Sequence, residues 1–80
     1  MVQVDFKGFE VDLNDYRGCI ALMDKYGDSE GAFFGNNEEG EDVIISINED
    51  NITLQTLQDN GWIRTNVLWR DGTTEELYDR

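Results

Sequence analysis

The chain has 80 residues, of which 18 are acidic and 6 are basic, so that its formal net charge at pH 7 is −12. This length predicts a single domain over residues 1–80, since a second core would need about 50 residues of its own. The charge disfavours binding to nucleic acid or to an anionic membrane, and an apolar content of 39% excludes a disordered acidic tail.

The N-terminal residues have the alternation of a β-hairpin. Residues 2–6 (VQVDF) carry an apolar side chain at every second position, and residues 9–13 (FEVDL) do so in the opposite register. Lys7-Gly8 lies between the two runs, and a glycine there supplies the positive φ of a two-residue turn. The sequence therefore predicts two paired strands joined at Lys7-Gly8.

From Asn14 onward the apolar period becomes that of a helix. Apolar side chains recur at i, i+3, i+4 and i+7, namely at Tyr16, Cys19, Ile20 and Met23. This spacing predicts an amphipathic helix over Asp15–Tyr26, with Asn14 as its N-cap and Gly27 as its C-terminal stop. The apolar stripe is expected to pack on the sheet.

Residues 28–42 (DSEGAFFGNNEEGED) form the main loop of the prediction. They contain six acidic residues, several glycines and no basic residue, which is poor material for a regular element. Within them, Ala32-Phe33-Phe34 either forms a short edge strand or places the two phenylalanines in the core. An exposed ring at either position would be an anchor for a partner.

The C-terminal half is predicted to be a β-meander. Residues 42–48 (DVIISIN) are rich in β-branched side chains, which indicates a central strand buried on both faces. Further strands are expected near Ile52 and Leu54 and over residues 62–70 and 73–78, with turns at 48–51, 59–61 and 71–72. The predicted class is α+β, with an antiparallel sheet made of an N-terminal β-hairpin and a C-terminal β-meander of three to four strands, and with one amphipathic helix on one face.

The residue types disfavour an enzyme. The chain has no histidine, and its one cysteine, Cys19, lies on the apolar stripe of the predicted helix, so no nucleophile–base pair, structural metal or cofactor is expected. A lone cysteine forms no intramolecular disulfide, and no stretch resembles a signal sequence or a membrane span, which predicts a reducing, cytoplasmic location. A hydrolase with a carboxylate pair is the least favoured alternative, because a thin core can hardly form the necessary cleft.

Acidic residues gather in the middle of the chain. No basic residue occurs between Lys25 and Arg64. Closely spaced carboxylates can imitate the phosphates of nucleic acid, although they can also form no more than a solvated rim. The candidate partner-binding residues are Asp28, Glu30, Phe33, Phe34, Glu38, Glu39, Glu41, Asp42, Glu49 and Asp50.

Two functional hypotheses follow. In the first, the chain is an inhibitor that occupies the cationic surface of a basic protein, such as a nuclease or another nucleic-acid-binding enzyme, by nucleic-acid mimicry. Small acidic phage proteins that disarm bacterial defence, including some anti-CRISPR and antirestriction proteins, are similar to this chain in size and charge. That similarity is compositional and assigns no residue a role. An immunity protein against a nuclease toxin fits the same physics.

In the second hypothesis, the chain is a regulatory or assembly module whose contacts are apolar, through Phe33, Phe34, Trp62 or Trp69, and its acidity serves solubility. Salt separates the two, since an electrostatic contact weakens as ionic strength rises and an apolar one changes little. In both cases the chain is expected to be a monomer or a weak homodimer.

Overall fold

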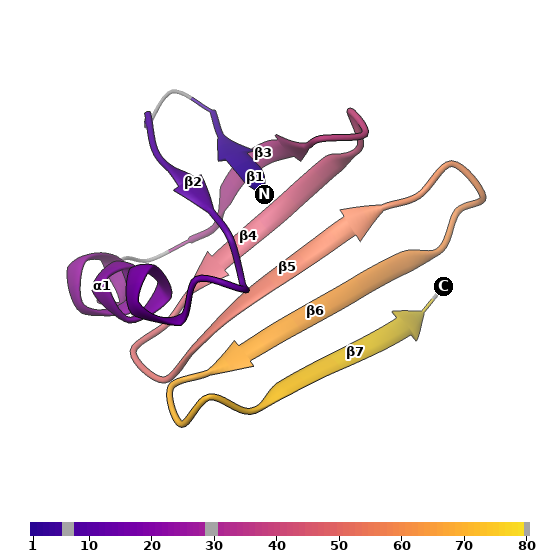
Figure 1. Ribbon diagram of the computed structural model, residues 1–80. Coiled ribbons are helices and arrows are strands. Elements are labelled where there is room, and N and C mark those ends of the chain that lie inside the picture. The colour runs from indigo at the N-terminus through magenta and orange to yellow at the C-terminus, as the bar shows by residue number, and fades with distance from the viewer. Residues whose placement is uncertain (6–7, 29–30, 80) are drawn as a thin grey trace.

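The computed structural model describes residues 1–5, 8–28 and 31–79, and it contains one helix and one antiparallel sheet (Figure 1). The strands lie side by side in the order β2-β1-β3-β4-β5-β6-β7. The predicted α+β class, with its N-terminal hairpin and C-terminal meander, is confirmed. The elements are β1 (Val2–Val4), β2 (Glu10–Val11), α1 (Tyr16–Tyr26), β3 (Phe33–Asn37), β4 (Asp42–Ile47), β5 (Asn51–Leu57), β6 (Ile63–Trp69) and β7 (Thr74–Asp79).

The N-terminal hairpin forms with shorter strands than predicted. Val2 pairs with Val11, and the Val4 amide donates a hydrogen bond of 3.1 Å to the Phe9 carbonyl oxygen. Gly8 has the positive φ, +71°, that the turn prediction requires. Lys7, the other predicted turn residue, lies outside the described residues.

The helix begins one residue later than predicted. The N-cap is Asp15, whose carboxylate accepts a hydrogen bond of 3.1 Å from the Gly18 amide. The prediction of Asn14 as N-cap is wrong, because the Asn14 amide donates to the side chain of Asp12 at 2.9 Å and this local turn precedes the helix. The helix ends at Gly27 as predicted, where an added Cβ would overlap the Met23 carbonyl oxygen and lie 3.0 Å from the Glu49 backbone.

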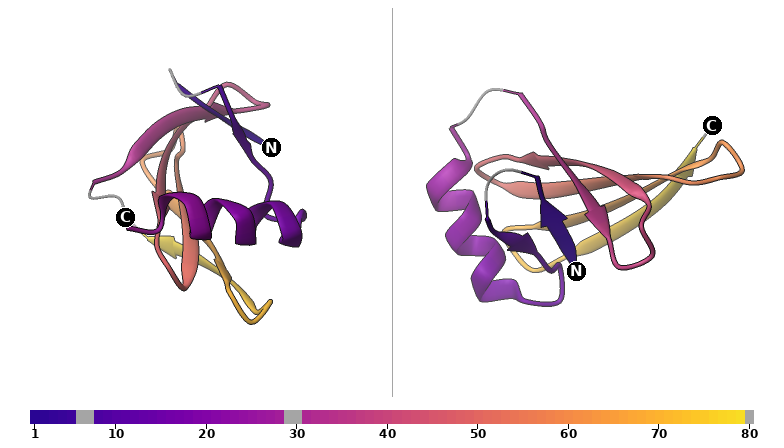
Figure 2. Two further views of the ribbon diagram at one scale, coloured as in Figure 1. Left: turned by 90° about the vertical axis from the view of Figure 1, so that its left-hand side faces the viewer. Right: turned by 90° about the horizontal axis from the view of Figure 1, so that it is seen from above.

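The core lies between α1 and one face of the sheet. Val43, Ile45 and Ile47 alternate along β4 and are buried, whereas Ile44 and Ser46 between them are only half-buried on the opposite, outer face. The prediction that this strand is buried on both faces is therefore wrong. The single helix lies against one face only (Figure 2), and no second layer among the described elements covers the other.

Residues 28–42 are not one long loop, because β3 runs through them. β3 lies between β1 and β4, so it is not an edge strand either. Gly35 permits this position, since a Cβ atom there would overlap the carbonyl oxygen of Gln3 on β1. Gly35, one of the glycines that made this segment resemble a loop, is thus explained by the close approach of β3 to β1.

The two phenylalanines of β3 point to opposite faces. Phe33 packs against the core, and its ring centroid lies 5.9 Å from that of Phe9 and 5.6 Å from that of Tyr26. Phe34 lies on the outer face and is 61% exposed. The core placement foreseen for both rings holds for Phe33 alone, because successive residues of a strand alternate between faces.

The helix covers only part of its face of the sheet. Figure 1 shows α1 near the β4–β5 turn, whereas the other ends of β5, β6 and β7 extend away from it. All six residues of β7 are exposed. Thr56, Arg64 and Tyr78 share the helix-side face through their cross-strand pairing but lie beyond the helix.

We expect Ile45→Ala to lower the free energy of unfolding by about 2 to 5 kcal/mol, since Ile45 is fully buried and the surrounding core can close the cavity only in part. Urea denaturation measures the change. The matched control is Ile44→Ala, on the half-buried outer face, which should cost clearly less. Equal losses for the two variants would contradict the assignment of faces.

We expect Asp15→Ala to destabilise the protein by about 0.5 to 2 kcal/mol, because it removes the acceptor for the Gly18 amide at the start of α1. Asn14→Ala should change stability less, since only the Asn14 backbone takes part in the preceding turn. Thermal unfolding of both variants measures this, and a larger loss for Asn14→Ala would restore Asn14 as the cap.

Candidate functional site

A groove opens on the helix-side face where α1 does not reach. It lies between the N-terminal hairpin and the β3–β4 turn on one side and strands β5 to β7 on the other, and its volume is about 590 Å³. Among the described residues that line it, Arg64 is the only basic one. We call this site the acidic groove, and its acidic side chains are those of Asp12, Glu38, Glu39 and Glu76. Glu75 also borders it, but its side chain lies on the opposite, outer face because Glu75 pairs with Val67.

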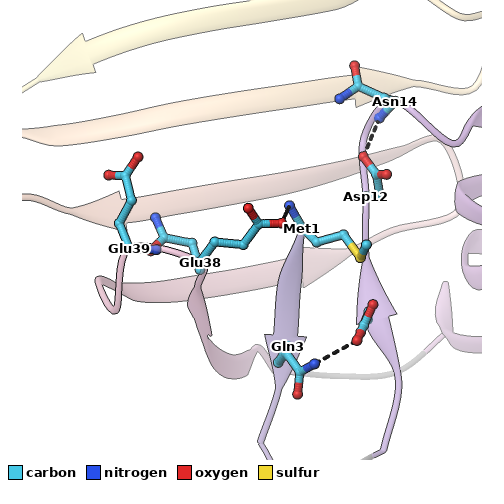
Figure 3. A network of polar contacts seen from close by, with 8 residues as sticks. Met1, Gln3, Asp12, Asn14, Glu38 and Glu39 are labelled. Atoms are coloured by element: carbon cyan, nitrogen blue, oxygen red, sulfur yellow. Dashed lines mark hydrogen bonds and ion pairs between the residues drawn. The ribbon is translucent and has the colours of Figure 1, made fainter.

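The first wall is built by turns (Figure 3). The side-chain oxygen of Asn37 accepts hydrogen bonds from the backbone amides of Glu39, at 3.1 Å, and Glu41, at 2.9 Å. These bonds fix the β3–β4 turn, so that Glu38 and Glu39 are presented from an ordered loop. The Glu38 side chain is 77% exposed and lies 3.6 Å from the amino group of Met1.

The second wall is built by β6 and β7. Arg64 stands opposite Thr56 on β5 and Tyr78 on β7. The Tyr78 hydroxyl donates a hydrogen bond of 2.7 Å to the Glu76 carboxylate. This bond and the charge of Glu76 raise the pKa of Tyr78, because both favour the protonated hydroxyl.

Only part of the groove was foreseen. Glu38 and Glu39 were among the predicted binding residues, but Asp12, Glu75 and Glu76 were not. Glu75-Glu76 is visible in the sequence as an acidic pair in a strand. This pair borders the same groove as the β3–β4 turn, although β5 and β6 lie between β4 and β7 in the sheet, and no local sequence pattern predicts that.

Glu41 and Asp42 lie at the same turn but are already engaged. Glu41 accepts a hydrogen bond of 3.0 Å from the Asn37 side chain, and Asp42 accepts one of 2.9 Å from that of Asn36. These two carboxylates help to shape the turn that carries Glu38 and Glu39. They are therefore less available to a partner.

The remaining acidic candidates lie at the other end of β4. Asp28, Glu49 and Asp50 line a second hollow of about 330 Å³ together with Arg70, which donates a hydrogen bond of 2.8 Å to the Glu49 carbonyl oxygen. A hydrogen bond to the Asp28 carboxyl group, and then the charge of Asp28, raise the pKa of Glu49. The six residues of β4 separate this hollow from the β3–β4 turn by about 20 Å. The acidic candidates thus form two groups, and Glu30 lies outside the described residues.

The outer face of the sheet carries exposed apolar side chains. Phe34 is 61% exposed, Leu77 54% and Leu57 41%. Val67 is buried on this face and does not belong to the main core. Trp62 and Trp69 are half-buried.

Within residues 1–5, 8–28 and 31–79, no group of three or more histidine, cysteine or acidic side chains has an arrangement suited to a metal ion. The helix of this part of the chain is too short and too polar to cross a membrane. Comparison with known protein families, curated proteins and solved structures finds no match.

Cys19 is a buried thiol on α1. It is 1% exposed, and its sulfur lies 3.2 Å from the Asp12 carbonyl oxygen, to which it donates a hydrogen bond. Burial, followed by the charges of Asp15 and Asp12, raises the pKa of the Cys19 thiol to about 11.

We expect Cys19 to react with Ellman's reagent at pH 8 at least tenfold more slowly in the folded protein than in urea, because thiolate formation is disfavoured and the sulfur is enclosed. The raised pKa also means that the unfolded chain loses this proton first. Stability should therefore fall as the pH rises from about 9 to about 11. Equal reaction rates in the folded and unfolded protein would contradict the burial.

Proposed function

We propose that the chain is a non-enzymatic inhibitor that occupies the cationic surface of a basic, nucleic-acid-handling protein. The observation that supports this most directly is the acidic groove, where the acidic side chains of Asp12, Glu38, Glu39 and Glu76, from three separate parts of the chain, line one recess together with Arg64 and Met1. Together with a net charge of −12, this arrangement attracts arginine and lysine side chains over a long range and offers them acceptors at close range.

The shape of the groove affects how much each contact contributes. A charge-assisted hydrogen bond contributes about 1.5 to 3 kcal/mol when it is shielded from water, but under about 1 kcal/mol on an open surface. Carboxylates that line a recess lose more water when a partner covers them than carboxylates on a convex rim. The groove is therefore a better site for specific binding than the second hollow, where Asp24 already forms an ion pair of 2.9 Å with Arg70.

The class of partner follows from charge and from competition. A surface that binds the phosphates of nucleic acid carries arginine and lysine side chains, and clustered carboxylates can occupy the same side chains. We propose that binding excludes nucleic acid from the partner, as in phage anti-defence or immunity proteins, and that it takes place in a reducing compartment such as the cytoplasm.

The second candidate function is an interaction module with apolar contacts. The observation that favours it is the outer face of the sheet, where Phe34 and Leu77 are more than half exposed. Binding through that face should be insensitive to salt and to charge reversal in the groove.

We expect the double variant Glu38→Lys/Glu39→Lys to bind the partner at least tenfold more weakly while unfolding at a similar temperature. Immobilised protein captures the partner from a bacterial lysate, mass spectrometry identifies it, and calorimetry measures its affinity. Affinity should also fall steeply between 50 and 300 mM salt, because the Debye length shortens about 2.5-fold over this range. Duplex DNA should compete with the protein for the partner. Glu41 and Asp42 are left unchanged because their side chains support the turn.

The matched control is Asp28→Lys/Asp50→Lys, which changes the net charge equally at the opposite end of β4. Equal losses of affinity in the two double variants would show that binding depends on the net charge of the protein and not on the groove. Unchanged affinity in both variants, at all salt concentrations, would refute the proposal and favour the apolar outer face.

A further inference from the structure

The free edge of β7 is the longest unpaired strand edge among the described residues. β7 is hydrogen-bonded to β6 on one side, no other described strand pairs with it, and all six of its residues are exposed. The opposite edge of the sheet is β2, which has two residues. A strand of six residues is long enough to pair with another chain.

The alternation of hydrogen bonds along β6 identifies which backbone groups of β7 are unpaired. The Trp69 amide donates to the Thr73 carbonyl oxygen at 2.9 Å, and the Arg70 amide donates to that of Asp50 at 2.7 Å. Odd-numbered residues of β6 therefore bond to β7, and even-numbered ones to β5. It follows that Thr74, Glu76 and Tyr78 turn their backbone N–H and C=O groups toward the free edge.

Apart from its charged side chains, the edge lacks the features that usually prevent pairing. β7 contains no proline and no lysine, and its pairing with β6 is continuous from Ile63↔Asp79 to Leu68↔Thr74, without a bulge. Three of its six side chains are acidic, namely those of Glu75, Glu76 and Asp79. Glu75, Leu77 and Asp79 lie on the outer face, and Glu76 lies on the helix-side face, where it lines the acidic groove.

The acidic side chains of β7 favour a basic strand over a second copy of this chain as the occupant of the edge. Antiparallel pairing of two copies about Leu77 would place Glu75 opposite Asp79, and pairing about Glu76 would place the two Glu76 side chains opposite each other. Like charges directly opposite are destabilising, and each copy also carries a net charge of −12. A basic strand would meet no such repulsion.

We infer that the free edge of β7 takes an extended basic segment of the partner as an additional antiparallel strand. This inference rests on the proposed function, because it specifies how the basic partner binds. Backbone hydrogen bonds to Thr74, Glu76 and Tyr78 hold the segment, and lysine or arginine residues stand opposite Glu75, Glu76 and Asp79, with an apolar residue opposite Leu77. Since Glu76 also lines the groove, the added strand runs beside it.

The probe is a peptide that follows this pattern, with the core Lys-Tyr-Val-Arg-Lys-Thr running from the position opposite Asp79 to that opposite Thr74. Amide hydrogen exchange, followed by NMR, measures its effect on each residue of β7. The amides of Thr74, Glu76 and Tyr78 should exchange at least tenfold more slowly when the peptide is bound. Those of Glu75, Leu77 and Asp79 already bond to β6 and should change less.

Two N-methylated peptides of equal charge provide the matched control. Methylation at the arginine and tyrosine, which stand opposite Glu76 and Tyr78, blocks amides directed at β7 and should weaken binding at least tenfold. Methylation at the valine and the second lysine, which stand opposite Leu77 and Glu75, blocks amides directed away from β7 and should leave the affinity within about threefold. Charge attraction alone cannot distinguish these two peptides.

A pair of protein variants tests the same edge from the other side. Tyr78→Pro removes one free-edge donor and keeps every carboxylate, whereas Tyr78→Ala removes the same side chain and keeps the donor. The proline variant should bind the peptide at least fivefold more weakly than the alanine variant. Equal affinities in two folded variants would overturn the inference.

The outcomes separate the edge from the proposed function. If the captured partner binds with the expected dependence on salt and groove charge, but the amides of Thr74, Glu76 and Tyr78 are protected neither by the peptide nor in the partner complex, the edge inference is overturned and the function stands. If no basic partner binds, the proposed function is refuted, and the peptide experiment still decides whether the β7 edge accepts a basic strand. If these amides become protected without peptide as the protein concentration rises, the edge pairs with a second copy and the inference is overturned.

Discussion

The position of one short helix sets the rest of the structure. The 11 residues of α1 give a helix about 16 Å long, which is too short to cover one face of a seven-stranded sheet. The apolar side chains are distributed accordingly, since Ile45, Ile47 and Ile52 of the core lie toward the β4–β5 turn, near the helix. Polar residues such as Thr56 and Arg64 occupy the same face where the helix is absent. The groove is thus a direct consequence of the length of the helix.

Close backbone approaches fix the helix and the sheet with respect to each other. Gly27 allows the end of α1 to lie against the β4–β5 turn, and Gly35 allows β1 to lie against β3. The Tyr16 hydroxyl donates to the Arg70 carbonyl oxygen and joins the start of α1 to the β6–β7 turn. These contacts leave the middle of the uncovered face open, between the N-terminal hairpin on one side and strands β6 and β7 on the other.

The charge of the chain is concentrated where it disturbs the core least. Half of the 18 acidic residues lie at or beside the two ends of β4 or on the exposed strand β7. Repulsion between them is reduced by exposure to solvent and, at the β3–β4 turn, by hydrogen bonds from Asn36 and Asn37. The same placement leaves acidic side chains and an unpaired backbone edge on one side of the molecule, which is the combination that a basic extended segment would require.

The sequence by itself determined the α+β class, with its N-terminal hairpin, single helix and C-terminal meander, because side-chain period and turn residues act over short distances. It also determined the acidity of the chain. Only the tertiary structure decided that β3 runs through the supposed loop, that Phe33 is inside while Phe34 is outside, and that Glu38 shares a groove with Glu76. Each of these depends on sheet order and on register between distant segments. A close approach at a glycine, or the meeting of an acidic turn with an acidic strand, leaves no periodic pattern in the sequence, since it arises from contacts between residues far apart along the chain.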